Sequence, residues 1–172
     1  PAVVYDTNAQ KIVIVYQDEY DSNVGSAIVG TVSGTSISFG TAVVFESGTY
    51  SNGDACYDVA AQKIVIAYRD GNNSNYGTVI VGTVSGTSIS FGSPSVFETA
   101  NSKLCSTVFD SNSNKVVIAY EDNGNLGYGT ALVYQTGYTS QNLTSENFIG
   151  MSRGFAVQTG DAAATGAETV FE

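Results

Sequence analysis

The side chains in this chain that could bind or catalyse are mostly carboxylates, amides and tyrosines that follow short apolar stretches. Asp18, Asp70 and Asp122 each end such a stretch and are followed by a polar segment. Because hard cations prefer oxygen ligands, these aspartates are candidate calcium ligands. Their spacing matches neither the EF-hand nor the Gly-Gly-x-Gly-x-Asp pattern, however. We therefore favour the alternative, in which each aspartate accepts hydrogen bonds from the turn that follows it.

Tyrosines and asparagines gather in the segments that differ most between otherwise similar parts of the chain. Variable loops on a regular scaffold are where binding specificity can be built. A tyrosine face stacks on a sugar ring while amides bond to its hydroxyl groups, so a glycan is the natural ligand. The alternative, which we favour, is that these are ordinary polar turns with tyrosines covering sheet edges. The candidate glycan-binding residues are Tyr20, Asn23, Tyr50, Asn52, Asn72, Tyr76, Asn123 and Tyr128.

Enzymatic chemistry has little support in the sequence. The chain has no histidine, which excludes Ser-His-Asp and Cys-His nucleophile systems. An acid-pair glycosidase is a third alternative because acids are abundant, but no pair stands out and the regular repetition of the aspartates favours a structural role. We expect no enzyme activity, no catalytic residues and no cofactor.

Two cysteines and two asparagines are candidates for covalent modification. Cys56 and Cys105 fall near the starts of equivalent strands, three positions out of register. A disulfide between them would link neighbouring repeats, and two buried thiols are the alternative. Without a further cysteine pair or a histidine, neither indicates a metal site. Asn72 and Asn142 each begin an Asn-x-Ser/Thr acceptor pattern for N-glycosylation.

The charge balance excludes one class of partner. Six Lys and Arg stand against sixteen Asp and Glu, for a net charge of −10, and the cations are scattered. Binding of a phosphate backbone needs clustered cations, so we expect no nucleic acid. No apolar run approaches the roughly 20 residues that span a bilayer, so we expect no membrane insertion.

These side chains must be positioned by a repeated element. Residues 28–40 recur letter for letter as residues 80–92, and the segment 11–18 recurs in similar form at 63–70 and 115–122. A period of this size is typical of repeat architectures, in which each unit buries its faces on its neighbours. The sequence therefore predicts three tandem repeats over residues 1–134 (1–48, 49–100 and 101–134) and a divergent segment over 135–172.

Each full repeat reads as four antiparallel strands. The Lys-Ile-Val-Ile strand is apolar on both faces, so it must lie in a sheet that is covered on both sides. A Ser-Gly pair predicts a two-residue hairpin before a last strand with only one apolar face, as expected at a sheet edge. The predicted strands are A (2–6, 55–59, 107–110), B (11–18, 63–70, 115–122), C (25–32, 77–84, 129–134) and D, which starts at Thr35 and Thr87. The B–C connections and the D–A connections (47–53 and 99–104) should then emerge at one end.

The fold class that follows is all-β, with propeller-like blades of about 52 residues. Three repeats are fewer than the four to eight blades of closed propellers, so two chains could share a ring or units could stack into a fibre. A three-fold β-trefoil or β-prism is the alternative.

The divergent segment ends in a sequence that is similar to the end of strand D. Thr169-Val-Phe-Glu172 is similar to Val43-Val-Phe-Glu46, and we expect residues 167–172 to complete a sheet, either within the chain or on a neighbouring copy. A helix is expected near residues 144–149 and a short strand at 154–158.

Three stretches resemble tandem-repeat proteins of bacteriophage tail fibres: residues 30–40, 109–120 and 142–150. The resemblance implies a non-enzymatic fibre component that is extracellular or on the virion surface. We therefore expect a structural and adhesive module that assembles with copies of itself, through β-edge contacts, into a homo-oligomer or filament. The alternative is a discrete lectin that binds surface glycans through the variable loops.

Overall fold

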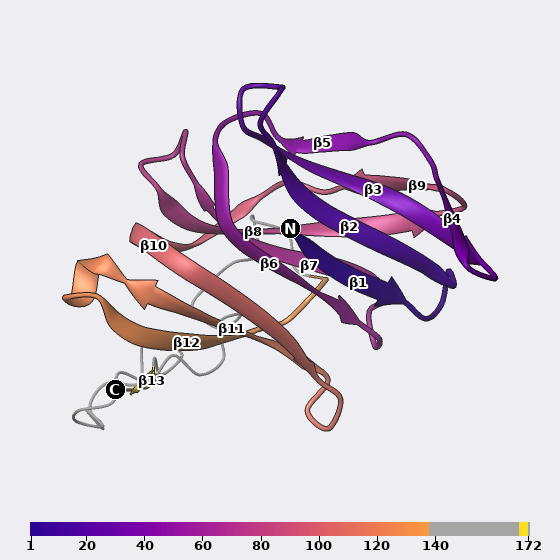
Figure 1. Ribbon diagram of the computed structural model, residues 1–172. Helices are drawn as coiled ribbons and strands as arrows, with labels where there is room; N and C mark the ends of the chain where they lie inside the picture. Colours follow the sequence, from indigo (N-terminus) through magenta and orange to yellow (C-terminus); the bar gives the residue numbers. More distant parts are fainter. Residues whose placement is uncertain (138–168, 172) are drawn as a thin grey trace.

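The protein is all-β, with two antiparallel sheets, neither of which is closed. The computed structural model describes residues 1–137 and 169–171 (Figure 1). Within these residues there is no α-helix, only a 3₁₀ turn at Asn123–Asn125, and no helix long and apolar enough to cross a membrane. The strands are β1 (Ala2–Asp6), β2 (Lys11–Asp18), β3 (Val24–Ser33), β4 (Ser36–Phe39), β5 (Val43–Glu46), β6 (Tyr50–Asp58), β7 (Lys63–Asp70), β8 (Tyr76–Ser85), β9 (Ser88–Phe91), β10 (Ser95–Asp110), β11 (Lys115–Asp122), β12 (Tyr128–Tyr134) and β13 (Thr169–Phe171).

The first sheet is a meander in the order β1-β2-β3-β4, and β5 also pairs with β3. The hairpin between β3 and β4 places Ser33 opposite Ser36, so its two-residue loop is Gly34-Thr35. This is one residue later than the sequence pattern predicted. Gly34 has a φ of 60°, and a glycine with positive φ at the first loop position is typical of a type II′ hairpin turn.

The second sheet has the order β13-β12-β11-β10-β8-β7-β6, with β9 also on β8. Its long strand β10 pairs with a different strand in each half: residues 95–101 pair with β8, and residues 102–110 pair with β11. The sequence predicted a loop at 99–104, and the structure corrects this to a strand. Likewise β6 begins at Tyr50, inside the predicted loop 47–53.

The register irregularities in β6 and β10 explain why these segments did not read as strands. Pairing shifts between Ser51 and Asp54 and between Lys103 and Ser106. Within the shifts, Asn52 and Leu104 have φ values of 51° and 52°. Such bulges interrupt the alternation of side chains that marks a strand in the sequence. The chain thus passes from one group of strands to the next without a true loop.

Strand pairing recurs at the sequence period. Val3 pairs with Ile14, Ala55 with Ile66, and Thr107 with Ile118, each 52 residues beyond the last. We call β1–β5 the first unit, β6–β9 with residues 95–101 the second unit, and residues 102–110 with β11–β13 the third unit. Within the third unit β13 pairs with β12, opposite Gly129–Ala131, which is the position that β5 takes on β3. The expected helix at 144–149 and strand at 154–158 lie outside the described residues.

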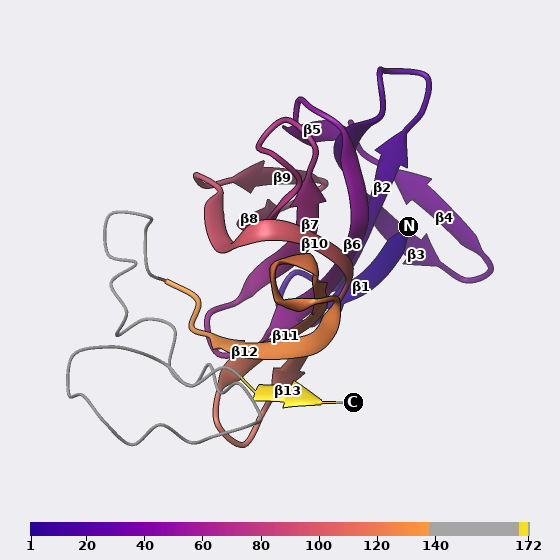
Figure 2. The same ribbon diagram turned by 90° about the vertical axis from the view of Figure 1, so that its left-hand side faces the viewer.

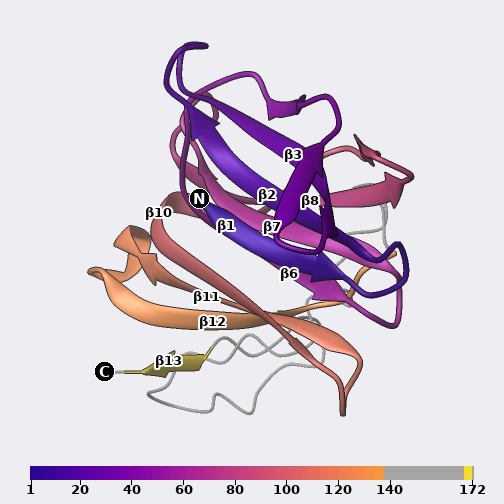
Figure 3. The same cartoon turned by 45° about the vertical axis from the view of Figure 1, so that its right-hand side comes forward.

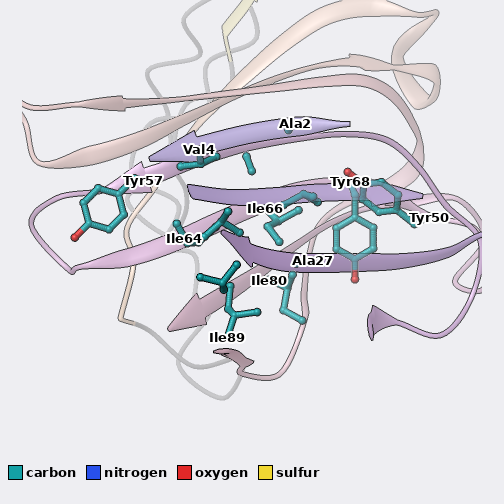
Figure 4. Packing of buried hydrophobic residues seen from close by; sticks show 14 residues of the cluster. Ala2, Val4, Ala27, Tyr50, Tyr57, Ile64, Ile66, Tyr68, Ile80 and Ile89 are labelled. Carbon is teal, nitrogen blue, oxygen red and sulfur yellow. The ribbon is translucent and has the colours of Figure 1, made fainter. Parts of the chain in front are cut away.

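The core consists of two layers of side chains, one on each side of the second unit. Figure 3 shows β6 and β7 of the second unit between strands of the first and third units, and Figure 4 shows the side chains of the layer between the first and second units. Residues 64–68 of β7 are each 0% exposed, so both faces of this strand are buried, as predicted. For the equivalent β2 and β11 the same prediction is wrong: among the described residues they are covered on one face only, because no second unit packs on the other face. The first interface packs Val4, Val13, Val15, Ala27 and Val29 against Ile64, Ile66, Tyr68, Ile80 and Ile89. The second interface packs Val65, Ala67, Val79 and Phe97 against Val116, Ile118, Tyr120, Leu132 and Tyr134.

Candidate functional site at the loop end

The B–C loops and the D–A connections meet at one end of the molecule, which runs from the top of Figure 1, at the loop between β2 and β3, down its left side to the turn before β12. Figure 2 shows the same end from its left-hand side. Backbone hydrogen bonds join them: Tyr50 N donates to Asn23 O (3.0 Å), and Gly71 N donates to Thr49 O (2.9 Å). Ser102 N donates to Asn75 O at 3.1 Å in the same way. The segment that leaves one unit is therefore held between the B–C loops of two units. We call this region the loop end.

The three aspartates that end strand B accept hydrogen bonds from the turns that follow them. Asp18 Oδ1 accepts from Tyr20 N at 3.1 Å, and Asp70 Oδ1 accepts from the backbone of residues 72 and 73 at 3.0 and 3.1 Å. Asp122 Oδ1 accepts from Gly124 N at 2.8 Å and caps the 3₁₀ turn. Asp70 and Asp122 are buried. Within the described residues, no group of three or more His, Cys, Asp or Glu is placed to hold a metal ion.

A second set of aspartates holds the opposite end of the units. Asp6 Oδ1 accepts from the backbone of residues 8 and 9, and Asp58 Oδ1 accepts from Ala61 N. Asp110 accepts from Asn112 N and from the Ser113 hydroxyl, and these bonds hold the pKa of its carboxyl below the ordinary value. Both ends of strands A and B thus use the carboxylate as an acceptor for the turn.

The tyrosines of the candidate glycan site are in different environments. Tyr20 is fully exposed, Tyr128 is exposed and Tyr76 is half-buried. Tyr50, in contrast, is only 4% exposed, and its ring packs edge-on against Phe45 at a centroid distance of 5.3 Å. The structure therefore corrects the assignment of Tyr50 as a ligand-binding residue, because the bulge in β6 turns its ring into the core.

The asparagines of the candidate site are exposed. Asn23, Asn52, Asn72 and Asn123 all lie on the surface. Asn72 lies against Gly48, where any added Cβ would collide with the amide. Asn123, with its amide oriented to match its neighbours, donates to Glu121 at 2.8 Å and accepts from Lys103 at 3.1 Å. Two of the four amides are therefore engaged in holding loops together.

A pair of buried contacts that the sequence reading missed connects the units at the loop end. Glu46 Oε2 accepts from the Tyr68 hydroxyl at 3.1 Å, and Glu46 Oε1 accepts from Gly48 N at 2.6 Å. Glu98 repeats both bonds, with the Tyr120 hydroxyl at 3.1 Å and with Ala100 N at 3.0 Å. Burial, together with the Glu46 carboxylate, raises the pKa of Tyr68. The recurrence of Val-Phe-Glu at the sequence period was the available signal.

The cysteines are free thiols. Cys105 is buried in the second interface and Cys56 packs against it. Burial raises the pKa of both thiols to about 12, so both stay protonated at neutral pH. Of the candidate glycosylation sites, Asn72 is exposed and Asn142 lies outside the described residues.

A cavity of about 350 Å³ lies away from the loop end, between the second and third units, and none of the predicted site residues lines it. Its wall includes Lys63, Val81, Tyr134 and Thr136. Burial raises the pKa of Tyr134 to about 12.

Comparison with family models, with curated proteins and with solved structures found no match for the chain.

Proposed function

We propose that the chain is a non-enzymatic structural and adhesive repeat module of an extracellular or virion fibre or filament. One observation carries the proposal: the chain builds the same inter-unit contact twice. The Glu46–Tyr68 bond and the Glu98–Tyr120 bond join successive units through residues 52 positions apart. A contact that a chain can repeat along its own length suits an extended assembly better than a single catalytic pocket.

The units suit the role of propeller-like blades. Each consists of antiparallel strands, and the second unit buries both of its faces on its neighbours. Burial between successive faces is the way in which blades are stabilised. A β-trefoil or β-prism, the alternative three-fold arrangement, would instead close the three repeats on one another.

Assembly through strand edges is supported by β13. This strand adds to the edge of β12, although it lies more than thirty residues further along the sequence. Addition of a strand to an exposed edge is a common means of association, and it needs only main-chain hydrogen bonds. The tail-fibre resemblance agrees with a module that joins others in this way.

The second candidate function, a lectin that binds surface glycans, is favoured by Tyr20. Its ring is fully exposed at the loop end, beside the exposed amide of Asn23. An exposed tyrosine has no packing role in the chain itself, whereas its flat face suits a sugar ring. In a fibre, the same loops would supply the adhesive function.

Electron microscopy of the purified chain tests the leading proposal. Filaments or regular end-to-end assemblies are expected, and uniform small particles at all concentrations would count against a fibre module. A glycan array tests the adhesive part, with Tyr20→Ala as the variant and Val59→Ala, at an exposed residue in the turn between β6 and β7 and away from the loop end, as its matched control. Binding that is lost only in Tyr20→Ala supports the lectin function, and an array without signal contradicts it.

A further inference from the structure

The exposed apolar side chains of this protein are concentrated on one sheet face. Of the twelve large apolar residues that are exposed within residues 1–137, six lie on the face of the first unit that points away from the second unit. Cross-strand pairs such as Tyr5 with Ile12 and Val32 with Ile37 place them on the same side of the sheet. The six residues are Val3, Tyr5, Val32, Ile37, Phe39 and Val44. Together with Ile12, Ile14, Tyr16 and Ile28, they form what we call the head face.

A second open face lies at the other end of the stack. On the third unit, Val108 is 58% exposed, and Val117 and Val133 on the neighbouring strands are half-buried. Antiparallel pairing places Val117 opposite both Val108 and Val133, so the three share a face. With Ala119 and Ala131 they form what we call the tail face.

The head and tail faces correspond, position by position, to the two sides of the covered interfaces. The head-face residue Ile14 corresponds to Ile66 and Ile118, which are both 0% exposed. The tail-face residue Val117 corresponds to Val13 and Val65, also 0% exposed. The chain therefore ends on one side with the surface that its units present to the preceding unit, and on the other with the surface that they present to the next.

The head face also carries the tyrosine that is equivalent to the hydroxyl donors of the Glu–Tyr bonds in the covered interfaces. Tyr16 corresponds to Tyr68 and Tyr120, whose hydroxyls donate to Glu46 and Glu98. Among the described residues, no group forms a hydrogen bond with the Tyr16 hydroxyl. In the sequence a third Val-Phe-Glu motif ends at residue 172, and its strand β13 pairs with β12 as β5 pairs with β3.

We propose that a second copy of this chain docks head to tail, with its head face on the tail face, in the geometry of the two internal interfaces. This inference rests on the proposed assembly function and deepens it by naming a sheet face, and not a strand edge, as the contact. Because the two surfaces differ, the contact is heterologous and leaves one head and one tail free unless a ring closes. Continuity with the internal interfaces selects the occupant, since those interfaces already match the two faces residue by residue.

Sedimentation and light scattering of the full chain test the proposal through paired variants. Ile37→Lys alters the head face and Val108→Lys alters the tail face; both side chains are exposed, so the fold is retained. Burying either charge without a partner should raise the dissociation constant at least tenfold. Leu126→Lys, at an 87% exposed loop residue, is the matched control and should associate like the wild type. Wild-type chain that stays monomeric up to about 1 mM overturns the proposal.

A disulfide cross-link tests the geometry. In the second interface Asp54 Oδ2 accepts from Thr107 N at 2.8 Å, so the equivalent residues Ser106 of one copy and Val3 of another should be adjacent. The double variant Val3→Cys/Ser106→Cys should form a linked oligomer on mild oxidation, whereas each single variant should not form it. The native thiols are buried or half-buried and protonated, so they compete poorly.

The outcomes separate this inference from the proposed function. Association that survives both lysine variants and gives no cross-link places the contact elsewhere, for example at a strand edge, and overturns the inference while the fibre function stands. Cross-linked oligomers that form neither filaments nor glycan complexes support the inference and contradict the fibre function.

Discussion

The first and second interfaces are built from equivalent strands, but different side chains fill them at the loop end. In the first, Phe45, Tyr50, Tyr68 and Phe91 form one group of rings with neighbouring centroids 5.3 to 5.6 Å apart. In the second, the rings of Phe97 and Tyr120 pack at a tilt, with centroids 5.1 Å apart. The position of Tyr50 is taken there by Ser102, which is 0% exposed and lies against Gly77 as Tyr50 lies against Gly25.

The second interface replaces part of this apolar contact with polar bonds. Asp54 accepts from the backbone and hydroxyl of Thr107 across the interface. The ion pair between Lys103 and Glu121, at 3.4 Å, instead joins two neighbouring strands within the third unit. The ion pair is partly exposed and contributes little. We infer that the strand register and the Glu–Tyr bond define the contact, while the apolar filling can vary and determines how strongly each interface is stabilised.

Exchanging the residues that differ should produce the largest effect. Tyr50→Ser removes a buried ring from the first interface and should lower the free energy of unfolding by about 3–5 kcal/mol, as large-to-small changes of aromatic residues do. Ser102→Tyr forces a ring into the closely packed second interface and should cost about 1–3 kcal/mol. Urea denaturation measures both. We expect the group of aromatic rings to make the first interface the more strongly stabilised of the two. A smaller loss of unfolding free energy in Tyr50→Ser than in Ser102→Tyr would contradict this.

The three equivalent isoleucines compare covered with open faces. Ile66→Ala and Ile118→Ala, at buried positions in the two interfaces, should each cost about 2–5 kcal/mol. Ile14→Ala, on the half-buried head face, should cost clearly less in dilute protein. At concentrations where copies associate, the cost of Ile14→Ala should rise toward the other two. A cost at Ile14 that is equal to the others in dilute protein would show that the head face is already covered.

The Glu–Tyr bonds should contribute equally to the two interfaces. Tyr68→Phe and Tyr120→Phe each leave a carboxylate oxygen without its hydroxyl donor, which costs about 1–3 kcal/mol. Tyr16→Phe removes the unused hydroxyl of the head face and should leave the stability of the dilute protein unchanged. Chemical denaturation of the three variants under one set of conditions checks this. A loss in Tyr16→Phe would mean that its hydroxyl already has a partner in a single copy.

Much of the architecture was predictable because apolar alternation and the sequence period both survive in the structure. The all-β class, the two buried faces of strand B in the second unit, and the gathering of variable loops at one end follow from these patterns. The same pattern overstated the burial of β2 and β11, because a strand's second face is buried only where another unit covers it. The reading failed where bulges interrupt the alternation, as at Asn52 and Leu104, so β10 was divided and Tyr50 was placed on the surface. The Glu46–Tyr68 bond could not be foreseen, because it joins units and depends on how their faces stack.

High pH should lower the free energy of unfolding, because protonated groups are buried in the second interface. Burial raises the pKa of Tyr134 from 10.0 to about 12, and raises those of Cys56 and Cys105 from 9.0 to about 12. Above pH 9 to 10 the unfolded chain loses these protons while the folded chain keeps them, so the stability present at neutral pH is lost progressively up to about pH 12. Each group contributes a slope of about 1.4 kcal/mol per pH unit in that window. Tyr134→Phe, in the second interface, should therefore make the decline shallower between pH 10 and 12, measured by urea denaturation at each pH. An unchanged slope would show that Tyr134 ionises as readily in the folded chain as in the unfolded one.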